Sequence, residues 1–269
     1  MRFLKSFIDG GYGGAGEIEQ DFCEYSDVFG KQPVLISCDL NFNDTLPNKA
    51  YPCCVKVQMD VLIKEGLPTL VAESEHSYIS AVCAALSKHI GGIFVGQGII
   101  GSSATAFLMF YIPERMAGVS KKMLNEVFMG SFRRVETSVT MDPEGLQYKK
   151  YLYPNAVQFK KSENTKLLRQ LKMYGDDGNL PRPIKFNLIF STKNEALEFY
   201  SESMTKQFVF VDLIPEPAPE GMVLPRFRLI ITRTLPFNVE LLERVDKYLL
   251  DLCEKYNAEY RSLETDILE

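Results

Sequence analysis

The chain has 269 residues, a formal net charge of −5, and 46% hydrophobic residues, among them 18 Phe and 13 Tyr. This length suggests one large or two ordinary domains, and the apolar content is sufficient for two cores, which excludes a disordered chain. The acidic balance argues against a protein built to hold nucleic-acid phosphates, because such proteins need an excess of basic residues.

We expect a cytoplasmic protein with no membrane segment. The first residues contain no apolar run of signal-peptide length, and no stretch approaches the roughly 20 apolar residues that span a bilayer. The six cysteines show no Cys-x-x-Cys pattern and no paired spacing with histidine. Free thiols in a reducing compartment are therefore expected, with no metal and no cofactor.

The first half of the chain reads as β-β-α-β-β-α-β. A Gly-rich, acidic lead-in occupies residues 1–30, and a domain follows over residues 31–155. Ser74 can cap a helix that ends at Gly91, and Ser120 can cap a second, shorter helix. Alternation and β-branched content predict strands at 33–42, 53–62, 93–100, 105–112 and 132–141.

The second half has the clearest helix signals. After a join at residues 148–161 and a helix around 165–173, Thr192 and Glu195 have the spacing of a capping box. Asn238 is a good cap for a long final helix, whose apolar residues recur at helical spacing: Leu242, Val245, Leu249, Leu252 and Tyr256. Strands are predicted at 184–190, 208–214 and 227–232. Both halves therefore predict α+β sandwiches of ferredoxin-like character with mainly antiparallel sheets.

The closing residues Tyr256-Asn257-Ala258-Glu259-Tyr260, followed by Thr265, resemble the end of the regulator of ribonuclease E activity B (RraB) family. Residues 182–186 and the capped helix over residues 195–200 fit the opening of the same family. The resemblance makes residues 162–269 an RraB-like domain. The family usually continues with Asp-Gly-Trp after its Glu-Tyr pair, where this chain has Arg261-Ser262-Leu263.

The first half resembles a bacterial domain of unknown function that is often fused ahead of an RraB-like domain. The matching residues are Gly92-Ile93-Phe94-Val95-Gly96, Phe110-Tyr111, Tyr148 and Tyr151-Leu152-Tyr153-Pro154. These motifs are short and largely structural, so they imply a fold and no chemistry.

Proteins of the RraB family bind a ribonuclease and modulate it without catalysis. The resemblance implies a cytoplasmic, bacterial, non-catalytic regulator with a protein partner, such as a ribonuclease, but does not imply that ribonuclease E itself is the partner. The acidic residues on one predicted helix form either a solvated stripe or a docking surface for a basic partner. Tyr260 either contacts the partner or packs the final helix on the sheet. The candidate interaction surface consists of Arg182, Glu195, Glu198, Glu202, Glu259, Tyr260 and Arg261.

Two binding alternatives remain open. Paired basic residues such as Arg133-Arg134, with aromatic residues near some of them, would suit an RNA-binding module, which predicts a basic, aromatic sheet face. The segment from Gly11 to Gly16 matches G-x-G-x-x-G, with Asp39 at the end of a strand 23 residues later, which would suit a nucleotide. No apolar crossover helix follows these glycines, so we favour a loop.

Catalysis is not favoured. The only histidines, His76 and His89, lie 13 positions apart on one predicted helix, or about 20 Å at 1.5 Å per residue, too far to share a metal or a relay. Cys53 and Cys54 are adjacent in a strand and should point to opposite faces. Asp176-Asp177 in its Gly-bounded loop is expected to form a turn.

Overall fold

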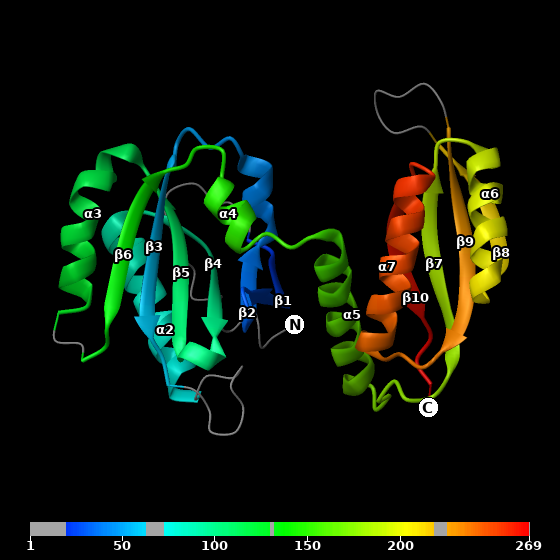
Figure 1. Ribbon diagram of the computed structural model, residues 1–269, viewed down its shortest axis with the longest axis horizontal. Coiled ribbons are helices and arrows are strands. Elements are labelled where there is room, and N and C mark those ends of the chain that lie inside the picture. The colour runs from blue at the N-terminus through cyan, green and yellow to red at the C-terminus, as the bar shows by residue number, and fades with distance from the viewer. Residues whose placement is uncertain (1–19, 63–72, 130–131, 218–224, 269) are drawn as a thin grey trace. The chain divides into compact units, whose positions relative to one another are not determined.

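The computed structural model describes residues 20–62, 73–129, 132–217 and 225–268. The chain divides after Asn155 into two compact units, which we call the N-terminal unit and the C-terminal unit (Figure 1). Each unit is built on one antiparallel sheet with helices packed against it. Across the described residues, no helix combines the length and the apolar character needed to cross a bilayer.

The N-terminal unit contains a six-stranded sheet in the order β1-β2-β4-β5-β3-β6. The segment β3-α2-β4-β5-α3-β6 has the ferredoxin-like βαββαβ connectivity, and the β1–β2 hairpin extends the sheet beyond β4. The elements are β1 (Phe22–Phe29), β2 (Gln32–Asp39), the 3₁₀ helix η1 (Leu40–Thr45), β3 (Cys53–Asp60), α2 (Glu73–Ile90), β4 (Ile93–Ile100), the 3₁₀ helix η2 (Gly101–Ser103), β5 (Thr105–Ile112), α3 (Glu114–Val127), β6 (Val135–Met141) and α4 (Leu146–Tyr151).

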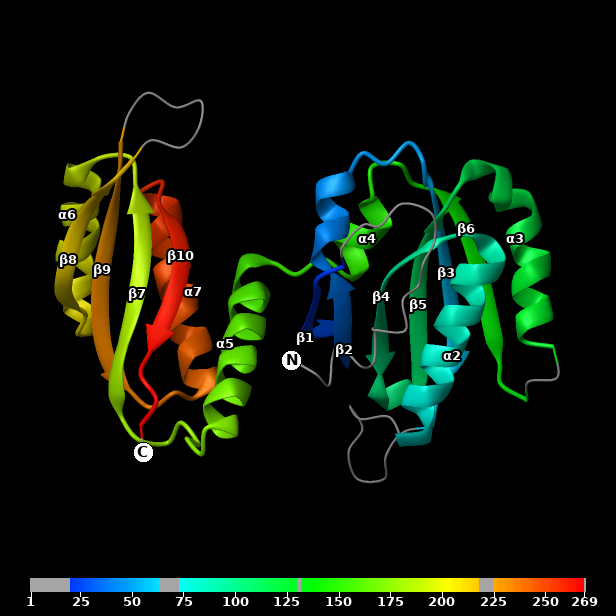
Figure 2. The same ribbon diagram turned by 180° about the vertical axis from the view of Figure 1, so that it is seen from behind.

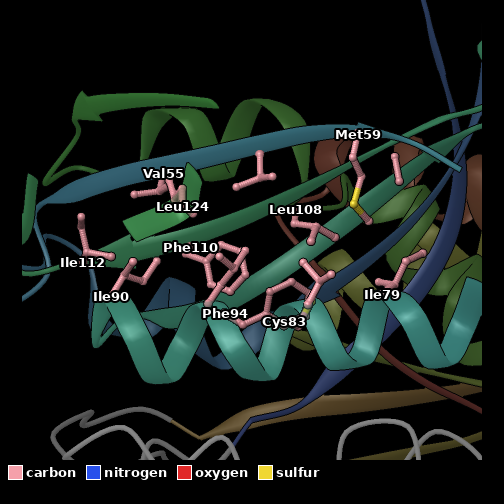
Figure 3. Close-up of a cluster of buried hydrophobic side chains, with 14 of the residues drawn as sticks. Val55, Met59, Ile79, Cys83, Ile90, Phe94, Leu108, Phe110, Ile112 and Leu124 are labelled. Atoms are coloured by element: carbon pink, nitrogen blue, oxygen red, sulfur yellow. The ribbon is translucent and has the colours of Figure 1, made fainter. Parts of the chain in front are cut away.

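Both faces of this sheet are covered by described residues. Alternation along β5 sends Phe110 toward α2 and α3, into the apolar cluster of Figure 3, and Tyr111 toward the opposite face. There Tyr111 packs against Phe42 of η1 and near Tyr148 of α4. The middle strands of this sheet are therefore core on both faces, whereas β6 and the end of β3 keep exposed residues such as Gln58, Glu136 and Ser138.

Several details of the N-terminal unit differ from the sequence-based expectation. Helix α2 begins at Glu73, so Ser74 lies inside the helix and is not its cap, and the start of the predicted join is the helix α4. Strand β1 lies inside residues 1–30, where the acidic, Gly-rich composition obscured its short alternation. Helix α3 begins at Glu114 and not at Ser120. The Ser120 hydroxyl donates to the carbonyl of Ala117 inside the helix, which is the bond a serine makes in mid-helix, so it does not cap.

The C-terminal unit contains a four-stranded sheet in the order β10-β7-β9-β8, with every neighbouring pair antiparallel. Strand β9 lies between β7 and β8, so β7-α6-β8-β9-α7-β10 is also a ferredoxin-like βαββαβ unit, and the predicted fold class is confirmed. The elements are α5 (Ala156–Met173), β7 (Arg182–Phe190), α6 (Lys193–Ser203), the 3₁₀ helix η3 (Met204–Lys206), β8 (Val209–Glu216), β9 (Arg226–Leu235), α7 (Val239–Lys255) and β10 (Glu259–Thr265).

Helices α6 and α7 cover one face of this sheet. Alternate β7 residues, including Phe186 and Leu188, point into the core shared with the two helices. Helix α5 packs against α7 and begins at Ala156, nine residues before the predicted start near Thr165. The first turns of α5 bury the polar residues Lys160 and Asn164. Because the buried side of these turns is polar, the hydrophobic pattern of the sequence did not indicate a helix there. Figure 2 shows the sheet from the side opposite to α6 and α7, and we call this side the open face.

The two caps predicted for the C-terminal unit are present. Thr192 and Glu195 form a complete capping box at the start of α6, and the Asn238 side chain accepts a hydrogen bond of 2.9 Å from the Leu241 N–H. We expect Asn238→Ala to lower the free energy of unfolding by about 1 kcal/mol, because the first turn of α7 loses its acceptor. Urea unfolding followed by circular dichroism measures the change. Asn194→Ala, at an exposed position inside α6, is the control and should change stability by less than half as much.

Candidate interaction surface

Arg182 does not lie on the surface, which corrects its place in the predicted interaction site. Its side chain is 1% exposed and forms a bidentate ion pair with Asp176, in which the Nη2–Oδ1 distance is 2.7 Å. It also donates to the carbonyls of Leu180 and Asp266. The guanidinium holds the pKa of the Asp176 carboxyl well below its usual range, helped by the N–H of Leu268. Through the contacts of Arg182 with Asp266 and of Asp176 with Leu268, this ion pair holds residues 266–268 against the turn before β7.

Tyr260 is also buried, and its role is structural. The ring packs in the core between sheet and helices, and its hydroxyl donates a hydrogen bond of 2.8 Å to Asp246 of α7. Asp246 accepts a second bond, of 2.6 Å, from Asn164 of α5. Burial raises the pKa of the Asp246 carboxyl to about 6 although both hydrogen bonds lower it. Of the two roles considered for Tyr260, the structure supports packing of α7 on the sheet.

Lys160 joins α5 to the same cluster. Its ammonium lies 4.6 Å from the centre of the Tyr260 ring and donates to the backbone carbonyl of Arg261 at 3.0 Å. The buried polar cluster therefore connects α5, α7 and β10. It positions the backbone of β10 at the point where the side chain of Arg261 turns outward.

The three acidic residues of α6 have different environments. Glu195 completes the capping box, so its carboxylate accepts a hydrogen bond from the Thr192 N–H. Glu202 forms an ion pair with Lys255 and accepts a bond of 2.8 Å from the Tyr256 hydroxyl. The ion pair with Lys255 lowers the pKa of Glu202. Glu198 is exposed. Two of the three carboxylates thus hold the helix in place, which makes a continuous acidic docking stripe a weaker interpretation.

Glu259 and Arg261 lie in a network of ion pairs on the open face. Arg261 contacts Glu216 of β8 at 2.9 Å and Glu259 at 3.6 Å. Arg226 and Arg228 of β9 complete the network, with distances of 3.2 Å from Arg226 to Glu259 and from Arg228 to Glu216. We call these five residues the charged face.

The charged face covers an apolar residue at the centre of the sheet. Ile189 of β7 lies opposite Arg228 on one side and Glu259 on the other, and it is only 2% exposed. Because long charged side chains can lay their apolar stems over such a residue, the network both buries Ile189 and presents charges of both signs to the outside. The sequence interpretation missed Arg226, Arg228 and Glu216. The alternation of the two arginines in a strand could have placed both on one face.

The other predicted chemistries find no support among the described residues. The segment from Gly11 to Gly16 lies outside them. The Asp39 carboxylate accepts hydrogen bonds from Gln20, Asp21 and Asn41, so its contacts are internal. In the described part of the chain no group of three or more His, Cys, Asp or Glu is placed to hold a metal ion.

The cysteines and the acidic turn have structural surroundings. All six thiols are free and buried. Cys53 and Cys54 belong to the two opposite cores of the N-terminal unit, as predicted from their adjacency. The Asp176 and Asp177 side chains accept from the N–H groups two residues later, which is the geometry of a turn.

The C-terminal unit is thus a ferredoxin-like α+β sandwich with charges of both signs on its open face. Residues 161–265, which span most of α5 and all of the βαββαβ segment, match the family model described as "Regulator of ribonuclease activity B". The expected resemblance of the C-terminal half is therefore confirmed. The resemblance of the N-terminal half to a domain of unknown function stays a prediction. No curated protein matches the chain in sequence.

Solved structures with some likeness to the chain are distant. An unknown protein from Galdieria sulphuraria is 10% identical over 81% of this chain and 99% of that chain, with a TM-score of 0.23. A putative glycine cleavage system transcriptional repressor is 9% identical over 80% of this chain and 98% of that chain, with a TM-score of 0.25. Likenesses this low carry no argument about function.

Proposed function

We propose that the protein is a non-catalytic regulator that binds a ribonuclease through the charged face of its C-terminal unit. The observation that carries the proposal is the family match over residues 161–265, since the family is defined by regulation of a ribonuclease. In this proposal the protein is bacterial and acts in the cytoplasm, where the ribonuclease is active. The N-terminal unit has no assigned part in it.

The charged face has physical properties that suit a protein partner. Its five side chains project from three strands, so their positions are fixed by the sheet and by the ion pairs. Arginine guanidinium groups are well suited to recognise carboxylates at an interface, and complementary charges give specificity more than affinity. Glu259, 51% exposed at its side chain, and Arg261, 38% exposed, are the most accessible members.

The test is an enzyme assay combined with a binding measurement. The main endoribonuclease of the source organism is purified, and its cleavage of an end-labelled RNA is followed with and without the full chain. We expect a concentration-dependent change in the cleavage rate and a complex detectable by calorimetry without RNA. No change in rate together with no binding would refute the proposal.

The double variant Glu216→Arg/Arg261→Glu tests the charged face itself. The swap keeps an ion pair between positions 216 and 261, sets like charges against Arg228 and Glu259, and inverts the charges that a partner meets, so we expect binding to weaken by about 10-fold or more. Lys193→Glu, at an exposed position outside the charged face, is the matched control and should bind normally. If the swap binds as tightly as the wild type, the charged face is not the contact.

RNA binding remains the alternative, and the geometry of the open face does not favour it. Phe186 and Phe190 of the central strand β7 and Tyr260 of the edge strand β10 point to the helices, so these aromatic residues form no stacking platform. A titration of fluorescent single-stranded RNA with the full chain tests this alternative directly. Tight binding of RNA that the charge swap abolishes would put RNA in place of the ribonuclease.

A further inference from the structure

A lysine lies in the N-terminal sheet at the boundary between the covered and the exposed part of one face. Lys56 of β3 is half-buried, and its neighbours in the sheet are Met109 of β5 and Ser138 of β6. Met109 is buried in the core that includes α4, whereas Ser138 is exposed. The Lys56 side chain therefore lies where this face of the sheet becomes open to solvent.

Aromatic rings hold the ammonium group of Lys56 in place. It lies 4.9 Å from the centre of the Phe107 ring and 4.3 Å from the centre of the Tyr151 ring. Phe29 of β1 packs against both rings, with centroid distances of 6.1 Å to Phe107 and 6.0 Å to Tyr151. Cation–π contacts attract the ammonium group to the ring faces but leave its positive charge without a negative charge beside it.

The charge of Lys56 has no carboxylate partner among the described residues. Glu136 lies opposite Gln58 on the same face of the sheet, but its carboxylate pairs with Arg134. Lysines that are withdrawn from water are usually paired with an acid, because an isolated charge is costly to desolvate. The uncompensated charge of Lys56 is therefore available to an anion from outside the protein.

A second ammonium group lies beside the same ring. Lys150 of α4 is exposed, and its ammonium lies 5.0 Å from the centre of the Tyr151 ring, also without an ion pair in the part of the chain that the structure describes. Two cations near one ring suit a group with two negative charges. A phosphate monoester carries about −1.5 to −2 at pH 7 and has three acceptor oxygens, to which the hydroxyl of Ser138 can also donate.

We infer that Lys56, Lys150 and Ser138 form a binding site for a phosphate monoester. Lys56 is fixed by the rings around it, while Lys150 and Ser138 belong to two other elements, α4 and β6. The site recognises the phosphate group itself, which inorganic phosphate and phosphorylated small molecules share. Because the site lies in the N-terminal unit, it is separate from the charged face and does not depend on the proposed function.

Calorimetric titration of the full chain with sodium phosphate and with AMP tests the inference. We expect one site per chain, whose dissociation constant rises by about 10-fold or more in Lys56→Met, because a hydrogen bond between charged groups is lost. Methionine keeps the apolar contact with the rings, and circular dichroism checks the fold. Lys122→Met is the matched control, since Lys122 is exposed on α3, which packs on the opposite face of the sheet. It should bind both probes as the wild type does.

The second lysine and the two probes complete the test. Lys150→Met, at an exposed position where no unfolding is expected, should weaken binding by about 3-fold. Tighter binding of AMP than of phosphate would assign the site to a phosphorylated small molecule, and equal or weaker binding of AMP would assign it to free phosphate. The inference is overturned if neither probe binds at about 10 mM, if Lys56→Met and Lys122→Met lose affinity equally, or if neither Lys56→Met nor Lys150→Met changes it.

Discussion

Arg182→Met should cost about 3–5 kcal/mol of the free energy of unfolding, because it leaves a buried carboxylate without its counter-ion. The Arg182 side chain is 1% exposed and makes two hydrogen bonds to Asp176 as well as bonds to two carbonyl groups. Methionine has a similar volume, so the loss reports the charge and the hydrogen bonds more than a cavity. Thermal and urea unfolding of the full chain measure it.

Two further variants separate the ion pair from a role in binding. Arg244→Met, at an exposed position of α7, should change stability by less than about 0.5 kcal/mol. The double variant Asp176→Leu/Arg182→Met should recover part of the lost stability, because an apolar pair can replace a buried ion pair, although the N–H groups of Gly178 and Leu268 lose their acceptor. If Arg182→Met were as stable as the wild type and lost only partner binding, Arg182 would be an interaction residue after all.

Asp246 should make the C-terminal unit more stable as the pH falls from 7 to 4. In the folded protein the pKa of this carboxyl is about 6, whereas the ordinary value of 3.8 applies when the chain is unfolded. The folded state therefore takes up the proton first, so its stabilisation is complete below pH 3.8 and is lost as the pH rises through 6. At about 1.4 kcal/mol per pKa unit, the change is on the order of 3 kcal/mol.

The comparison with Asp246→Asn isolates this contribution from those of other carboxylates. The wild type should gain stability relative to the variant by on the order of 3 kcal/mol between pH 7 and pH 4, since asparagine does not titrate. Urea unfolding at the two pH values measures the difference, and a carbon-13 titration of the Asp246 carboxyl should give a midpoint near 6. A difference in stability that is the same at both pH values would contradict the expectation.

The sequence predicted the ferredoxin-like halves well where local signals act alone. The Thr192–Glu195 capping box and the Asn238 cap depend on residues three positions apart, and both are present. Ser120 shows the limit of the same method, since a serine hydroxyl bonds to the backbone in mid-helix as readily as at a cap. The start of α5 was missed because Lys160 and Asn164 are buried through contacts with distant residues.

The candidate surface was harder to predict than the fold. The sequence around Arg182 contains no pattern that indicates a buried ion pair with Asp176. Arg261 and Glu216 are 45 residues apart in sequence and meet only because the strand order brings β10 and β8 into one sheet. Pairing of this kind follows from the topology, so a linear pattern identified Arg261 and Glu259 but not their three partners.

The arrangement of the charged face also determines the distance over which its electric field acts on another molecule. Each of its three arginines lies within 3.2 Å of one of its two glutamates, so their electric fields largely cancel and only one net positive charge is left, which is screened beyond the Debye length of about 8 Å at physiological ionic strength. An approaching molecule is therefore not drawn in from a distance, and association should proceed near the unsteered rate of about 10⁵–10⁶ M⁻¹s⁻¹. Selectivity then arises at contact, where an incoming carboxylate or ammonium group has to compete with an existing ion pair. Added salt should consequently change the lifetime of a complex more than the rate at which it forms.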